Sequence, residues 1–98
     1  MLKITEAGRI KVASPQFAEE VRGFIRTWRT SGKSEEEGKR MVITRIALEL
    51  ASHNGIVPER EEFSRFLDEN VAEINAAAST MLANAMISDS KDTNGSVN

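Results

Sequence analysis

The sequence contains no cysteine and no tyrosine, and it has one histidine and one tryptophan. A chain without cysteine forms no disulfide and offers no thiolate to a metal ion, so a reducing compartment is permitted. No apolar run reaches the roughly 20 residues that cross a bilayer, and residues 1–12 lack the apolar core of a signal peptide. We therefore expect a cytoplasmic protein that does not insert into a membrane.

Motifs for catalysis are missing as well. The sequence has no Ser/His/Asp set, no glycine-rich phosphate loop and no paired-carboxylate motif. The single histidine, His53, has no cysteine or second histidine near it, which favours a surface or packing role over that of a ligand or base. We predict a protein that is not an enzyme and needs no cofactor or metal.

The net charge of −2 hides an uneven distribution. Residues 1–45 carry ten Lys and Arg against six Asp and Glu, a net +4, whereas residues 46–98 carry three against nine, a net −6. The basic half is where an anionic partner would bind. A weak overall charge argues against indiscriminate coating of nucleic acid, but it allows a localised surface that reads DNA.

Residues 41–52 predict a central helix that is apolar on two sides. At 100° per residue, Val42, Ile46 and Leu50 share one face, while Met41 and Leu48 fall on the opposite side. A chain of 98 residues with 40% hydrophobic residues forms one domain with a small core. We therefore expect the second face to be covered by the same helix of a second subunit.

The segment before the first helix predicts a short strand. Ile10 and Val12 alternate with polar neighbours over residues 9–13. A lone strand leaves its backbone groups unpaired, and pairing with its own copy across a two-fold axis satisfies them. The expected fold is therefore mainly α, a ribbon-helix-helix in which an N-terminal strand and two helices intertwine as a dimer.

The sequence also predicts where the first helix and the second, central helix begin. Ser14 followed by Pro15 predicts the start of the first helix, and Gly32 predicts its end. The second helix has two alternatives: it begins with a capping box of Ser34 and Glu37, or residues 34–38 form an acidic loop and the helix begins near residue 39.

The residues after Pro58 predict a long amphipathic helix. Its apolar residues recur at spacings of three and four. Asn70 either caps a second, shorter helix together with Glu73 or fixes the register between identical helices. Unbroken, the helix would extend past the two earlier ones, so we predict a tetramer whose subunits meet through Phe63, Leu67, Asn70, Val71, Ile74 and Met81.

Basic residues in the first half are the predicted DNA contacts. If the strand buries Ile10 and Val12, then Arg9, Lys11 and Ala13 face outward, where Arg and Lys donate to guanine O6 and N7. The alternative is an ordinary solvated edge strand whose charges oppose aggregation.

For phosphate contacts we predict Lys39 and Arg40, which would join the free amides of the central helix in an anion site if that helix starts there. Arg22 and Arg26 belong to a basic stripe that either contacts phosphates or is plain solvated surface. Three glutamates at residues 35–37 count against an anion at this place.

The sequence resembles the TraM family of conjugative plasmids, tetrameric accessory proteins of the relaxosome. The resemblance covers residues 9–12, 21–25 and 46–50 and is most specific at Glu62-Phe63-Ser64-Arg65, Glu69-Asn70-Val71, Ile74 and Met81-Leu82. It implies a protein that binds repeated sites near an origin of transfer and helps to assemble the nicking complex, without cutting DNA itself. A relaxase or the coupling ATPase would be a further partner.

Three hypotheses follow for the function. The first is sequence-specific binding of double-stranded DNA as a relaxosome accessory protein. The second is a ribbon-helix-helix repressor or antitoxin, and the third is a helical protein-interaction adaptor without a nucleic-acid partner. The expected organisation is an N-terminal arm (1–8), a DNA-binding domain (9–53), a helical oligomerisation segment (54–88) and a disordered tail (89–98).

Overall fold

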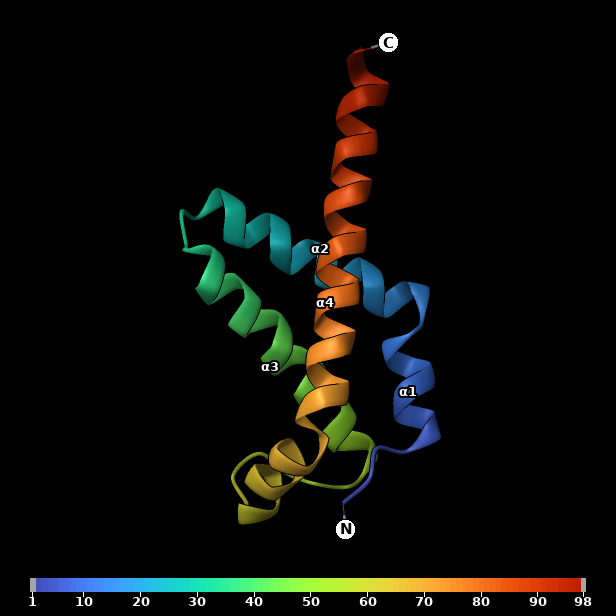
Figure 1. The fold of residues 1–98 in the computed structure, drawn as a ribbon, viewed down its shortest axis with the longest axis vertical. Helices are drawn as coiled ribbons and strands as arrows, with labels where there is room; N and C mark the ends of the chain where they lie inside the picture. The colour runs from blue at the N-terminus through green and yellow to red at the C-terminus, as the bar shows by residue number, and fades with distance from the viewer. Residues whose placement is uncertain (1, 98) are drawn as a thin grey trace.

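A computed structural model describes the backbone of residues 2–97 and the side chains of residues 2–85. It contains helices α1 (Glu6–Val12), α2 (Pro15–Thr30), α3 (Glu35–His53) and α4 (Glu61–Val97). In Figure 1, α2 and α3 form a hairpin and α4 crosses it along the longest axis of the molecule. Residues 2–97 contain no strand, so the predicted ribbon-helix-helix fold is wrong and the structure is all-α.

Helix α1 occupies the segment predicted as a strand. Thr5 caps this helix, because its Oγ1 accepts a hydrogen bond from the Gly8 N–H at 3.0 Å. Gly8 and Val12, one turn apart, are buried, whereas Ile10 is 65% exposed. A strand with no neighbour leaves its N–H and C=O groups unpaired, and a helix pairs them internally. The alternation of Ile10 and Val12 therefore suggested the wrong period, because burial follows a spacing of four.

Helix α2 begins and ends where the sequence predicts. The Ser14 Oγ accepts a hydrogen bond from the Phe17 N–H at 3.2 Å, and Pro15 is the first residue of the helix. Gly32, with φ of 74°, follows the end of α2 in the left-handed region that glycine adopts readily.

Helix α3 begins with the capping box rather than near Lys39. The Ser34 Oγ accepts a hydrogen bond from the Glu37 N–H at 3.2 Å, and the helix starts at Glu35. Gly55, with φ of 71°, follows the end of α3 in the left-handed region that glycine adopts readily.

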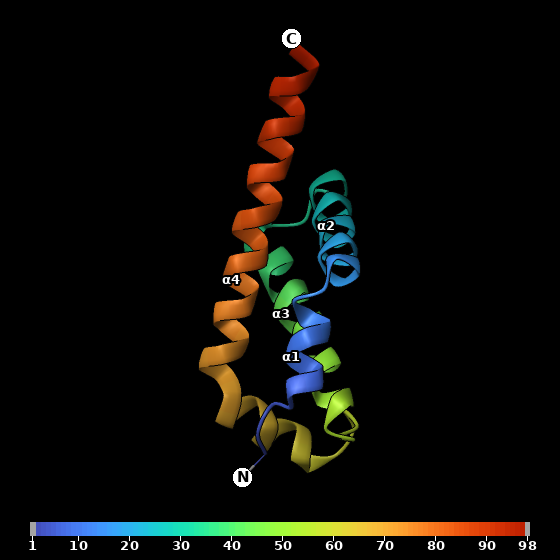
Figure 2. The same cartoon turned by 90° about the vertical axis from the view of Figure 1, so that its right-hand side faces the viewer.

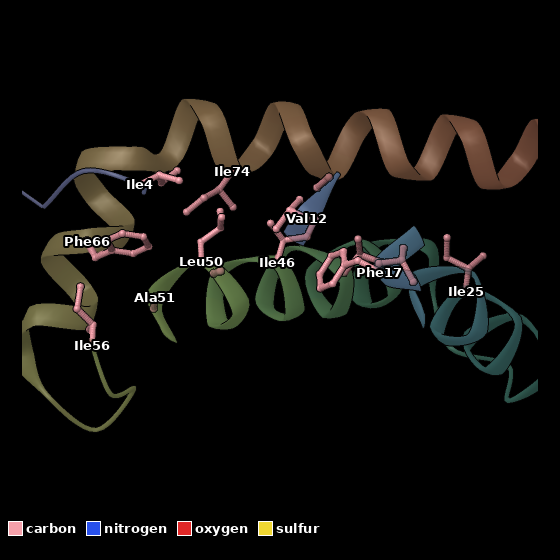
Figure 3. Packing of buried hydrophobic residues seen from close by; sticks show 14 of the residues in the cluster. Ile4, Val12, Phe17, Ile25, Ile46, Leu50, Ala51, Ile56, Phe66 and Ile74 are labelled. Atoms are coloured by element: carbon pink, nitrogen blue, oxygen red, sulfur yellow. The ribbon is translucent and has the colours of Figure 1, made fainter. Parts of the chain in front are cut away.

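One apolar core joins all four helices, and α3 lies at its centre. Val42, Ile46 and Leu50 are all buried, and α3 contacts α1, α2 and α4. Figure 3 shows how side chains from the other helices converge on this face of α3. The remaining buried apolar residues are Ile4, Val12, Phe17, Val21, Ile25, Ala47, Ala51, Ile56, Phe66, Ile74, Ala78 and Ala85.

Helix α4 bends at Asn70, whose φ of −121° and ψ of 16° are not helical. Figure 2 shows the part of α4 before the bend turning away from the long part that follows it. A break at Asn70, one of the two alternatives that the sequence leaves open, is therefore confirmed. The hydrogen bonds found for its side chain are not those of a cap, which accepts through Oδ1: its Nδ2 donates to the carbonyls of Leu2 and Phe66.

The residues predicted to join subunits pack mainly within their own chain. Ile74 is buried, and Phe63, Leu67 and Met81 are partly buried against the core, whereas Val71 is 53% exposed. Contacts between subunits through these residues stay a prediction.

The core also spans the predicted domains, since Ile4 of the N-terminal arm and Ala85 of the helical segment both belong to it. The predicted tail lies where the structure describes no side chains. Within the described residues, no helix combines the length and the apolar character needed to cross a membrane.

Gly38 provides a test of the packing between α2 and α3. A Cβ at this position would lie 2.0 Å from Trp28 Cδ2, so the ring would have to move. We expect Gly38→Ala to lower the free energy of unfolding by about 1–3 kcal/mol. Urea unfolding followed by the fluorescence of Trp28, the single tryptophan, measures this change.

Gly23→Ala is the matched control, because a Cβ at Gly23 meets no atom within 4 Å. Replacing a glycine inside a helix should then raise the free energy of unfolding by roughly 0.5–1 kcal/mol. Equal stabilities of the two variants would contradict the close approach at Gly38.

Candidate protein-interaction groove

The second apolar face of α3 lies open to solvent. Met41, Thr44 and Leu48 follow one another at spacings of three and four, which places them on one stripe of the helix. Together with Phe24 of α2, they line a groove of about 460 Å³, here called the α2–α3 groove. Met41, Leu48 and Phe24 are each only partly buried, so part of their apolar surface is accessible to a partner.

Charged residues border this apolar stripe, and most of them are cationic. Lys33, Arg40 and Arg45 line the α2–α3 groove, together with the carboxylate of Glu37. Lys33 and Arg40 are exposed, and their side chains make no ion pair within residues 2–85. The groove therefore presents two cations that the fold itself does not use.

Arg45 is a cation that the fold does use. Its guanidinium donates to Glu20 of α2 and to Glu49 of α3, with Nη2 at 2.9 Å from Glu49 Oε1. Its Cζ lies 5.1 Å from the centre of the Phe17 ring, a cation–π geometry. Desolvation by burial opposes the charged form, but the hydrogen bonds to Glu20 and Glu49 outweigh it and raise the pKa of Arg45. Arg45 thus ties α2 to α3 beside the groove.

Glu49 extends this network toward the end of α3. Its side chain is 13% exposed, and Nε2 of His53 lies 3.0 Å from its Oε2. Desolvation by burial acts to raise the pKa of Glu49, but its hydrogen bonds with Arg45 and His53 prevail and lower it. His53 therefore pairs with a carboxylate. Within the residues that the structure describes, no group of three or more His, Asp or Glu residues could hold a metal ion.

The residues predicted to read DNA bases do not share one face. On helix α1, Arg9 and Lys11 point about 160° apart, and Ala13 is the residue that caps the end. Arg9 is bound to Glu73 of α4 by two hydrogen bonds, of 2.7 Å from Nε and 2.9 Å from Nη2. These hydrogen bonds lower the pKa of Glu73. The strand that grouped Arg9, Lys11 and Ala13 is absent, and DNA contact by any of them stays a prediction.

The residues predicted to contact phosphates are spread over two helices. Arg22 pairs with Glu19, and Arg26 is exposed on the same helix. Lys39 and Arg40 lie in the second turn of α3, because the helix starts at Glu35. The free amides of α3 therefore lie beside three glutamates. The anion site is predicted only for a helix that begins at Lys39, and α3 does not begin there.

Sequence reasoning identified the second face of α3 but not the residue from α2 that lies against it. Phe24 belongs to the apolar spacing of the first helix, and nothing local indicates that it borders the outer face of the next helix. For the α3 side of the groove, the sequence signal is the spacing of Glu37, Met41, Thr44 and Leu48, which is four, three and four.

Comparison with known proteins finds no family model, no curated protein and no solved structure that matches the chain. The resemblance to the TraM family and the relaxosome function that it implies therefore stay predictions. Over residues 2–97 the fold is all-α, and within residues 2–85 the open apolar groove is bordered by two cations, Lys33 and Arg40, that make no ion pair.

The Glu49 network predicts that stability depends on pH. Because the pKa of Glu49 is lower in the folded chain, the unfolded chain takes up this proton first as the pH falls. The stabilisation is complete above the ordinary glutamate pKa of about 4.3 and is lost as the pH falls through the lower folded value. We expect Glu49→Gln to remove this contribution, so that its free energy of unfolding falls less than that of the wild type between about pH 5 and pH 3.

Urea unfolding at each pH measures the difference. Glu59→Gln is the control, because Glu59 is exposed between α3 and α4 and makes no ion pair within the described residues, so this variant should follow the wild type. A Glu49→Gln curve that parallels the other two would show that the network adds no stability.

Proposed function

We propose that the protein is a helical interaction module that binds an amphipathic helix with acidic flanks in the α2–α3 groove. The observation that carries this proposal is the open apolar stripe of Met41, Thr44 and Leu48 with Lys33 and Arg40 at its border. Protein grooves of this kind receive the apolar face of a helix, which contacts them through residues three, four and seven positions apart.

The shape of the groove favours a helix over a small molecule. Sites for small molecules enclose most of the ligand surface, whereas the α2–α3 groove is an open trough. Met41 and Leu48 are seven residues apart, so the stripe extends for about two helical turns, or roughly 10 Å. A helix lying along α3 covers such a stripe without needing an enclosed cavity.

The charges at the groove favour acidic flanks on the partner. Lys33 and Arg40 have no carboxylate partner among the described residues, and Arg45 stays charged at the edge. Complementary charges at the border of an interface speed association and fix the orientation of the partner. Glu37 disfavours a second carboxylate directly beside it, so the acidic residues should lie toward Lys33 and Arg40.

Duplex DNA is the competing partner, as in the relaxosome hypothesis. Its support is the net charge of +4 over residues 1–45, with ten Lys and Arg against six Asp and Glu, and the resemblance to the TraM family. DNA binding requires several cations that neutralise phosphates together. Arg9, Arg22 and Arg45 are paired with carboxylates of their own chain, and the first turn of α3 carries three glutamates. These carboxylates disfavour a phosphate backbone, so we prefer a helical partner to duplex DNA.

A designed peptide tests the proposal. The probe is a fluorescent helical peptide of about 18 residues, long enough to be helical, with a leucine stripe flanked by glutamates. We expect saturable binding to the full chain by fluorescence anisotropy. Arg40→Glu should weaken this binding by about tenfold at low salt, because it replaces an attraction by a repulsion.

Arg65→Glu is the matched control, since Arg65 is an exposed cation of α4 outside the groove. It should bind the peptide as the wild type does, and a lysine-flanked peptide should bind poorly to both. Failure of the acidic peptide to bind, or equal effects of the two substitutions, would refute the proposal. Salt-dependent binding of a duplex would favour DNA, and a dimer that Leu48→Glu converts to a monomer would assign the groove to a second copy.

A further inference from the structure

Residues 2–4, here called the leading segment, are held at the bend of α4 through their backbone. The Leu2 N–H donates to Glu69 Oε2 at 2.8 Å, and Asn70 Nδ2 donates to the Leu2 carbonyl at 2.7 Å. At the end of α3, Asn54 Nδ2 donates to the Lys3 carbonyl at 2.6 Å. The leading segment thus joins α3 to α4 at the point where α4 changes direction.

A buried side chain adds to these hydrogen bonds. Ile4 is fully within the core, and Figure 3 draws it at the bend, where Phe66 precedes and Ile74 follows Asn70. Farther along the same segment of chain, Arg9 binds Glu73, four residues after Glu69. The N-terminal residues therefore contact α4 on both sides of its bend.

The local sequence does not force this bend. No proline or glycine occurs between Pro58 and Gly95. Sharp bends without these residues arise where a side chain inserts into the helical hydrogen-bond ladder. Asn70 Nδ2 donates to the Phe66 carbonyl at 2.8 Å, the group that a regular helix assigns to the backbone N–H of residue 70. The same amide donates to Leu2, so the leading segment holds the side chain that makes the bend.

We propose that the leading segment is a detachable clamp that keeps α4 bent, and that its release lets α4 straighten at Asn70. The hydrogen bonds at Leu2 N–H and at the Lys3 carbonyl are exposed, so water competes for them. A hollow of about 440 Å³ is lined by the leading segment together with Arg9, Glu69 and Asn70, so the segment is not tightly enclosed. Straightening would withdraw Phe66 from the core and expose apolar surface that the bent form covers.

The absence of native cysteine makes a direct distance measurement practicable. Glu62→Cys and Ala83→Cys place spin labels at two exposed positions of α4, one on each side of the bend. In a straight helix their Cα atoms would be about 32 Å apart at 1.5 Å per residue. We expect a clearly shorter distance by pulsed electron paramagnetic resonance in the full chain. Deleting residues 2–4 should shift it toward the straight value, and so should Asn70→Ala.

Lys3→Ala is the matched control, because the clamp uses only the backbone carbonyl of Lys3, and its distance should match that of the full chain. Since the deletion also removes Ile4 from the core, the double variant Asn54→Ala/Glu69→Ala breaks two of the bonds with the core intact, and it should show a partial shift. Far-UV circular dichroism reports whether each variant stays helical. An unchanged distance in helical variants would overturn the clamp, and so would a longer distance that appears only with loss of helix.

Discussion

The two-sided apolar character of α3 is the constraint on which the rest of the structure depends. Its face of Val42, Ile46 and Leu50 is buried where α1, α2 and α4 meet α3, and it lies at the centre of the core. Once three helices pack on that face, Met41 and Leu48 on the other side of α3 stay only partly covered, with Phe24 beside them. A small all-α chain therefore keeps an accessible apolar stripe as a direct result of how it builds its core.

The same packing determines which charges are available to a partner. Arg9, Arg22 and Arg45 each pair with glutamates, in two cases across helices, and these pairs link α1 to α4 and α2 to α3. The excess of basic residues in the first half of the sequence thus overstates the free positive charge. At the α2–α3 groove the available cations are Lys33 and Arg40. Two cations can orient a partner, but DNA binding requires more of them to neutralise its phosphates.

Helix α4 shows how a polar side chain redirects an apolar stripe. Its apolar residues recur at the spacing of a long amphipathic helix, yet Asn70 interrupts the hydrogen-bond ladder, and Phe66 and Ile74 on either side of it join the same core. The apolar residues of α4 before and after Asn70 therefore lie on two helical parts that run in different directions. The N-terminal residues stabilise this division because they bind on both sides of Asn70.

The sequence by itself determined the features that depend on neighbours a few residues away. The cap at Ser14, the left-handed glycine after α2 and the two faces of α3 follow from local hydrogen bonding and helical spacing. The capping box at Ser34 and the break at Asn70 are each one of two alternatives that the local sequence leaves open. Tertiary structure decided the rest. Residues 9–12 are helical, with Gly8 and Val12 of α1 packed into the core, and Phe24 borders the groove because α2 and α3 pack closely at Gly38. It also decided which cations stay free, since an ion pair such as that of Arg9 and Glu73 joins residues 64 positions apart. Local patterns carry no information on such distant partners, because chain folding alone brings them together.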